Sequence, residues 1–202
     1  IDGEATFAAI FDAIDAARAY VLVQFYILRD DDLGQELKER LIKKARAGCQ
    51  VRVLYDALGS HRLTRRYLDE LRDAGVIARD FHSIRRPRSR FQLNFRNHRK
   101  IVVVDGEVGF VGGHNVGDEY VGRDKTLTPW RDTHVRLKGP VVTQLQLIFM
   151  EDWYWCTEER LELRWSPANA EENATALILA SGPADQVETG TFYFLSAIEA
   201  AR

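Results

Sequence analysis

Residues 97–120 read NHRKIVVVDGEVGFVGGHNVGDEY, and this stretch predicts a strand, a tight turn and a return strand. The first strand is expected at Asn97–Val104, and Asp105-Gly106 is a dipeptide typical of a two-residue hairpin turn. Alternate residues of a strand project from the same face. His98 and Lys100 therefore place an imidazole beside an ammonium.

A glycine pair, Gly112-Gly113, comes shortly before Asn115, and its lack of side chains lets backbone and ligand approach closely. An imidazole, a cation and an amide suit a phosphate group, because the imidazole can attack phosphorus while the other two neutralise its oxygens. These residues predict His98 as the nucleophile, and His98, Lys100 and Asn115 as the phosphate-binding residues. Asp105 has the opposite parity on the strand, so we expect a structural role for it.

The segments around this stretch alternate between strands and helices. Strands are predicted at 20–28, 50–55, 76–81, 107–111 and 131–137, and helices at 4–18, 33–47, 63–74 and from Pro140 onward. The early β-α-β-α-β order favours helices packed on a largely parallel sheet. The predicted fold class is α/β, with a mixed β-sheet flanked by helices. The segment 85–96 is rich in arginine and reads as a basic loop, which either gathers anionic groups or is simply solvated.

Length and composition limit the class of protein. The 202 residues carry a formal net charge of −2, so an anion site has to be local. No apolar run is long enough to span a bilayer. Cys49 and Cys156 lack metal-ligand spacing, and His114 and His134 have no evident metal-binding partners, so we expect neither a metal nor a cofactor.

The end of the chain repeats its beginning. Residues 188–202, ETGTFYFLSAIEAAR, are similar to residues 4–18, EATFAAIFDAIDAAR, although alanine-rich amphipathic helices can also look alike by chance. We interpret the similarity as a tandem duplication whose second copy stops after its first helix. This predicts a first domain at 1–156, a linker at 157–173 and the start of a second repeat at 174–202, with a strand at 175–180. The first residue is Ile1, so we expect a piece of a longer protein.

The pattern His98-x-Lys100-x4-Asp105-x6-Gly112-Gly113-x-Asn115 closely resembles the HKD motif of the phospholipase D superfamily. The usual motif has serine at the second glycine, and the glycine found here is common in the cardiolipin synthases of that family. YDALGS at 55–60 and WRDTH at 130–134 are also similar to bacterial cardiolipin synthases, and the resemblance covers essentially the whole chain. It implies a phospholipase D-like domain that is the first of two tandem repeats, with Asp105, Gly112 and Gly113 as structural motif residues.

The resemblance also implies a reaction. A phosphatidyltransferase of this kind joins two phosphatidylglycerols through a phosphohistidine, here on His98, with the histidine of a second HKD half as general acid and base. The resemblance, and not the residues themselves, assigns the nucleophile to this half and not to the second half. Family members place an acid near Asp132 to orient the histidine, with Asp118 and Glu119 as rivals. A salt bridge of Asp132 with a neighbouring arginine, Arg131 or Arg136, is the structural alternative.

The implied partners are phosphatidylglycerol, a membrane surface, and a second HKD half in the same chain or a homodimer mate. Nucleic acid is not expected as a partner. The implied location is the bacterial cell membrane, with the anchoring segment outside this chain, and the isolated half is expected to be inactive. Three alternatives remain: a phospholipase D hydrolase giving phosphatidic acid, a dimeric phosphodiesterase nuclease, and a non-catalytic membrane-docking half.

Overall fold

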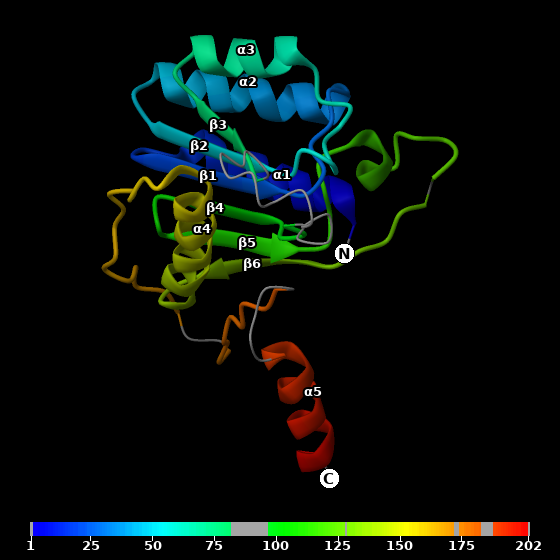
Figure 1. The fold of residues 1–202 in the computed structure, drawn as a ribbon, viewed down its shortest axis with the longest axis vertical. Coiled ribbons are helices and arrows are strands. Elements are labelled where there is room, and N and C mark those ends of the chain that lie inside the picture. The colour runs from blue at the N-terminus through cyan, green and yellow to red at the C-terminus, as the bar shows by residue number, and fades with distance from the viewer. Residues whose placement is uncertain (1, 82–96, 128, 172–173, 183–187, 202) are drawn as a thin grey trace, which may run out of the picture.

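The computed structural model describes residues 2–81, 97–127, 129–171, 174–182 and 188–201. At its centre lies a six-stranded sheet with the order β3-β2-β1-β4-β5-β6 (Figure 1). The strands are β1 (Tyr20–Phe25), β2 (Gln50–Tyr55), β3 (Ile77–Asp80), β4 (Ile101–Val104), β5 (Val108–Gly112) and β6 (His134–Lys138). The helices are α1 (Gly3–Ala16), α2 (Asp32–Arg46), α3 (Arg65–Asp73), the 3-10 turn η2 (Asp118–Val121), α4 (Val141–Thr157) and α5 (Thr189–Ala200).

The sheet is mixed, and the predicted fold class is confirmed. β1 pairs in parallel with β2, and β2 with β3, as the β-α-β-α-β order predicts. β4 pairs antiparallel with β1, and β5 and β6 extend the antiparallel half. A tight turn joins β4 to β5, as antiparallel strands allow, whereas the parallel strands β1, β2 and β3 are joined through the crossover helices α2 and α3.

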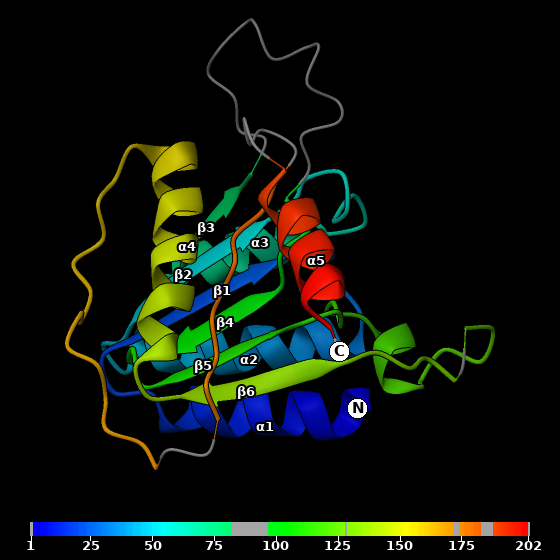
Figure 2. The same cartoon turned by 90° about the horizontal axis from the view of Figure 1, so that it is seen from below.

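Helices cover both faces of the sheet (Figure 2). Alternate residues of β1 explain why, because Val21 and Val23 point to one face while Tyr20 and Leu22 point to the other. On the first face they join a core built with α1, α2 and α3, and on the second face they meet α4. A central strand buried on both faces is therefore mostly apolar, and the amide side chain of Gln24 in β1 is buried with a hydrogen bond to Asp152.

Helix ends follow local capping chemistry. The side chains of Asp2, Asp31 and Thr64 accept hydrogen bonds from backbone N–H groups of the first turns of α1, α2 and α3. Gly48 and Gly75 follow α2 and α3 with φ of 92° and 90°, a conformation that favours glycine. The helix ends predicted at residues 47 and 74 lie one residue beyond the observed ends of α2 and α3.

β4 and β6, the strands that follow the HKD motif and Asp132, begin later than predicted. β4 begins at Ile101 and not at Asn97, so the HKD histidine and lysine lie in an extended segment before the strand. The ladder to β1 ends at the pair Gln24 and Ile101, and the preceding residues leave the sheet. β6 begins at His134, so Asp132 precedes that strand and does not open it.

The strand predicted at 175–180 is wrong, because residues 174–180 form no regular element. The backbone N–H of Ile178 donates to the side-chain oxygen of Gln144 on α4 at 3.0 Å, and not to a neighbouring strand. An apolar segment with high strand propensity needs a ladder partner, and the described residues supply none there. The arginine-rich segment 85–96 lies outside the described residues.

α5 keeps its apolar residues on the surface. Phe192, Phe194 and Ile198 are 59%, 67% and 70% exposed, and none of the helix's described residues is buried. Ile10 and Ile14, which correspond to Phe194 and Ile198, are part of the main core, whereas Ala8, which corresponds to Phe192, is exposed. In Figure 1 this helix projects from the body of the molecule. Among the helices of the described residues, none combines the length and the apolar character that crossing a membrane requires.

Candidate active site

His98 and Lys100 are in direct contact at the end of the sheet. The ammonium of Lys100 lies 2.9 Å from Nδ1 and 3.2 Å from Nε2 of His98, and it donates to the backbone oxygen of the same residue at 2.6 Å. Lys100 is only 3% exposed, while His98 faces solvent. The extended backbone therefore gives the side-by-side placement that a strand would give, with the cation buried beneath an accessible imidazole.

The surroundings favour a neutral imidazole. Burial and the charge of Lys100 lower the pKa of His98, and the carboxylate of Asp56 opposes this effect. Burial lowers the pKa of Lys100 to about 8, against an opposing influence of Asp132. At neutral pH the pair thus consists of an uncharged base and a mostly charged ammonium. A neutral ring has the lone pair that nucleophilic attack requires.

Tyr26, which sequence reasoning missed, completes the wall beside this pair. Its ring lies 4.7 Å from the ring of His98, and the ammonium of Lys100 lies 5.5 Å from the centre of the Tyr26 ring. A cation near an aromatic face is attracted by the ring quadrupole. Tyr26 follows the last residue of β1. Its side chain reaches the site because the strand ends there, and the sequence does not indicate that end.

Asn115 is buried and bridges two segments. Its Oδ1 accepts from the backbone N–H of Ile27 at 3.0 Å, and its Nδ2 donates to the hydroxyl of Tyr120 at 3.0 Å. A side-chain amide has two N–H donors. The second donor is the group that could meet a phosphate oxygen. The hydrogen bond from Ile27 to Asn115 also fixes the loop after β5 to the segment after β1.

Asp105 has no contact with the imidazole and organises the backbone. Its carboxylate accepts three hydrogen bonds of 2.8 Å from the backbone N–H groups of Arg18, Ala19 and Tyr20. Asp105 and Gly106 have φ of 54° and 70°, and a type I′ hairpin turn requires positive φ at both positions. The turn and the entry into β1 are thereby joined.

Asp132 lies against the glycine pair. A Cβ atom added at Gly113 would collide with its carboxylate, and one added at Gly112 would collide with the backbone of Thr133. The Asp132 carboxylate accepts from the N–H of Thr133 at 2.7 Å. Within the described part of the chain it makes no hydrogen bond to the ring of His98. Its charge instead acts on Lys100 and opposes the lowering of the lysine pKa.

The two rivals of Asp132 have partners elsewhere. Asp118 accepts from the backbone N–H of Leu33 at 3.0 Å, and Glu119 forms an ion pair of 2.5 Å with Arg29. Among residues 129–171, Asp132 forms no ion pair with a neighbouring arginine, so the salt-bridge alternative finds no support there.

Two buried carboxylates hold the segment that carries His98, and sequence reasoning missed both. Asp56, after β2, accepts from the backbone N–H of Asn97 at 3.3 Å. Asp152, on α4, accepts from the side-chain amide of Asn97 at 2.7 Å and pairs with Arg99 at 2.6 Å. The residues immediately before and after His98 are thus bound to the same helix.

His114, which is buried, and His134, which is half-buried, form a second pair of neighbouring side chains near Asp132. Their ring centres are 5.8 Å apart, and none of their four ring nitrogens has a hydrogen-bond partner among the described residues. Burial lowers the pKa of both, and that of His134 falls to about 4. No group of three histidine, cysteine, aspartate or glutamate residues in the described ranges could hold a metal ion.

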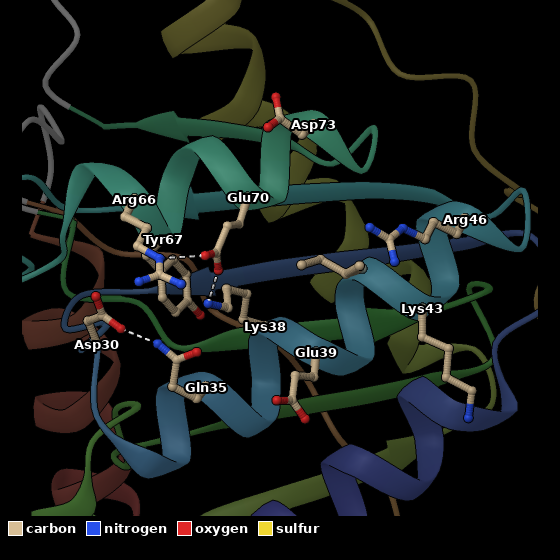
Figure 3. Close-up of a pocket in the computed structure, with 11 residues that line it drawn as sticks. Asp30, Gln35, Lys38, Glu39, Lys43, Arg46, Arg66, Tyr67, Glu70 and Asp73 are labelled. Atoms are coloured by element: carbon tan, nitrogen blue, oxygen red, sulfur yellow. Dashed lines mark hydrogen bonds and ion pairs between the residues drawn. The ribbon is translucent and has the colours of Figure 1, made fainter.

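A groove with a volume of about 930 Å³ lies elsewhere, between α2 and α3 (Figure 3). Lys38 and Arg66 point toward the carboxylate of Glu70, and Gln35 toward that of Asp30. None of the candidate site residues lines this groove. Because its opposite charges pair with one another, the groove reads as a contact between two helices and not as a substrate site.

Comparisons with known proteins match the whole chain. A family model described as "Cardiolipin synthase, PLD-like domain" matches residues 10–153. The cardiolipin synthase A proteins of Pseudomonas putida strain GB-1 and Pseudomonas entomophila strain L48 are 55% and 56% identical over 201 residues. Each match covers 100% of this chain and 42% of the relative, so the chain spans less than half the length of these curated relatives.

Solved structures show the same fold at low sequence identity. NucT from Helicobacter pylori matches with a TM-score of 0.57 and 13% identity, over 76% of this chain and 91% of that one. A phosphatidylserine synthase from Haemophilus influenzae Rd KW20 matches with a TM-score of 0.56 and 15% identity, over 73% of this chain and 34% of that one. At such identities the likeness concerns the fold alone.

Proposed function

The chain belongs to the PLD-like domain family of cardiolipin synthases, and from this premise we propose that the protein is a phosphatidyltransferase. It joins two phosphatidylglycerols into cardiolipin and releases glycerol. The observation that carries the proposal is the contact between the Lys100 ammonium and the exposed imidazole of His98, within a chain 55% identical to a cardiolipin synthase A. A neutral nucleophile beside a buried cation suits attack on an anionic phosphodiester.

In the first step, a ring nitrogen of His98 attacks the phosphorus of one phosphatidylglycerol. The new N–P bond forms as the bond to the glycerol oxygen breaks, and the histidine of a second HKD half supplies a proton to the departing glycerol. In the second step, a hydroxyl of another phosphatidylglycerol loses its proton to that histidine and attacks phosphorus. The N–P bond then breaks and cardiolipin leaves. Two displacements through a covalent intermediate replace one difficult step.

The other site residues serve the charge on the phosphate. Lys100 transfers its hydrogen bond from the ring to a phosphate oxygen, and the free N–H of Asn115 meets another oxygen. Asp132 keeps Lys100 charged, which the opposing influence of its carboxylate on the lysine pKa supports. In the complete two-half site it also accepts the single ring N–H of His98, which leaves the other ring nitrogen free to attack and so fixes the tautomer. Asp105, Gly112 and Gly113 shape the backbone.

We place the domain boundaries at 1–156, 157–173 and 174–202, the last range being the start of a second phospholipase D-like repeat. The exposed apolar face of α5 supports this, because the similar sequence of α1 buries its apolar face on a sheet. The catalytic partner is then a second HKD half, from the same chain or from a homodimer mate. One HKD motif lacks the general acid, so the isolated chain is inactive or nearly so. The substrate implies that the protein works at a bacterial membrane surface.

A product assay tests the proposal. Full-length protein is given phosphatidylglycerol vesicles, and the lipids are identified by mass spectrometry beside a His98→Ala control. Cardiolipin and glycerol from the wild type, and neither from the variant, are the expected result. Phosphatidic acid as the only product would make the protein a hydrolase. Cleavage of single-stranded DNA without lipid turnover would make it a nuclease.

A further inference from the structure

The two residues that flank His98 are tied to a single carboxylate on the opposite side of the sheet. Asp152 Oδ2 accepts from the side-chain amides of Asn97 and Gln24, each at 2.7 Å. Its Oδ1 accepts from the guanidinium of Arg99 at 2.6 Å. Asp152 is 8% exposed and lies on α4, far from the HKD motif in sequence.

From this geometry we propose that Asp152 is a positioning residue for the nucleophile, acting on His98 through Asn97 and Arg99. Side chains alternate along an extended segment. Because Asp152 holds the side chains of Asn97 and Arg99 on the α4 side, His98 and Lys100 are directed to the opposite side, where they contact each other. Asp152 touches neither the imidazole nor the ammonium, so its effect is indirect.

The segment needs such an anchor because it lies outside the sheet. The ladder between β1 and β4 ends at Ile101, so residues 97–100 lack strand hydrogen bonds that would fix their register. Asn97 is therefore held from both sides, by Asp56 through its backbone N–H and by Asp152 through its side chain. A small error in the direction of a nucleophile can cost about 100-fold in rate, so this fixing has a catalytic consequence.

A carboxylate is the group that this junction requires. Three donors converge on Asp152, from two amides and one guanidinium, and a carboxylate is an acceptor at both oxygens. Asparagine at this position would present its own N–H donors to Gln24 and Asn97, and Arg99 would lose its counter-charge. The buried Oε1 of Gln24 has no hydrogen-bond partner among the described residues. If residue 152 is asparagine, rotation of the Gln24 amide lets Oε1 accept from it, but this leaves the loss at Asn97 and Arg99 uncorrected.

The inference rests on the proposed role of His98, and its test uses turnover of bis(p-nitrophenyl) phosphate by full-length protein. This diester reports the histidine chemistry whatever the natural substrate is. Asp152→Asn is expected to lower kcat about 10- to 100-fold with KM within about 2-fold, because the nucleophile is misdirected while phosphate contacts remain. Wild-type kcat in a folded Asp152→Asn variant would overturn the inference.

A double variant that swaps the residues at positions 97 and 152 separates the positioning role from a folding defect. In the double variant Asn97→Asp with Asp152→Asn, the donor and acceptor change places and the hydrogen bond between the two positions is restored. We expect it to recover about tenfold or more of the lost kcat. Equal kcat in the double and single variants would overturn the inference. Glu151→Gln is the matched control, since this exposed neighbour on α4 lies outside the network.

The proposed function and the inference can fail separately. If the wild type hydrolyses the diester but makes no cardiolipin, the lipid proposal fails and the kcat comparison still decides the role of Asp152. If the wild type does not hydrolyse the diester, the imidazole NMR signals of His98 decide it instead. Signals that move in Asp152→Asn and return in the exchange variant are expected, and signals that stay unmoved in Asp152→Asn would refute the positioning role.

Discussion

The ammonium of Lys100 contacts both the ring and the backbone oxygen of His98, at 2.9 Å from Nδ1 and 2.6 Å from O. The nucleophile and its neighbouring cation are therefore one unit, and the position of each depends on the other. Asp152 binds the side chains on either side of His98, and the ring of Tyr26 lies beside the imidazole.

Replacing Lys100 by methionine is expected to abolish activity and stabilise the fold at neutral pH. Activity falls by at least about 100-fold, because the developing phosphate charge loses its buried cation. The folded-state pKa of about 8 lies below the ordinary 10.5, so burial disfavours the charged form at all pH values below 8. Removing that charge gains about 1–2 kcal/mol at pH 7.

The stability gained in Lys100→Met should depend on pH. Between pH 8 and 10.5 the unfolded chain binds the lysine proton and the folded chain does not, so wild-type stability rises with pH there. The advantage of Lys100→Met over wild type should therefore shrink from pH 7 to pH 10, as measured by thermal midpoints. An advantage that stays constant would show that packing, and not charge, is responsible.

The rate of the full-length enzyme should show a bell-shaped dependence on pH. The acid limb follows His98, whose pKa is lowered from 6.5, because only the neutral ring attacks phosphorus. The alkaline limb lies near pH 8, because Lys100 loses its proton there. Measurement of kcat/KM from pH 5 to 10 tests both limbs. A profile that is flat between pH 7 and 10 would contradict the role of the lysine charge.

Asp132 and Gly113 should act as one unit on the alkaline limb. Asp132→Asn removes a charge that raises the lysine pKa, so the limb moves to lower pH. Gly113→Ala places a Cβ where the carboxylate now lies, and we expect the limb to move in the same direction as the side chain is displaced. The double variant should be no worse than Asp132→Asn alone. Additive losses would show that the two residues act separately.

Local patterns in the sequence were enough to predict most elements of the fold. β2 has the predicted bounds, and the ends predicted for α2 and α3 lie within one residue of the observed ends, because a local signal such as a following glycine concerns adjacent backbone. The contact between His98 and Lys100 was also predictable, since alternation holds for any extended segment. The strand at 175–180 failed, because propensity does not supply a ladder partner.

The supporting residues of the site could not be predicted in this way. Asp152 meets Asn97 across 55 positions of sequence and Gln24 across 128, and no local pattern encodes such distances. Tyr26 reads as part of an apolar strand, and its approach to the site depends on where β1 ends. The residues that carry chemistry are thus visible in the motif, whereas those that hold them depend on tertiary packing.

The pair of His114 and His134, whose ring nitrogens are all buried, should make the fold sensitive to acid. Both have a folded-state pKa below the ordinary 6.5, with His134 at about 4, so the unfolded chain binds more protons in this window. Stability is fully present above pH 6.5 and falls as the pH drops toward 4. Facing groups modify the effect: Asp132 and Asp2 favour protonation, while Lys100 opposes it.

Replacing His134 by leucine removes a buried base that must take up a proton on acid unfolding. Between pH 6.5 and 4.5 the free energy of unfolding of the variant should fall by on the order of 2 kcal/mol less than that of the wild type. Thermal midpoints measured across that range test this. The matched control is His61→Leu, because His61 is exposed and far from the pair in sequence. It should keep the wild-type acid sensitivity. If His134→Leu and wild type lose stability in parallel, the acid response comes from other groups, and the unpartnered imidazoles are neutral packing residues without a titration of consequence.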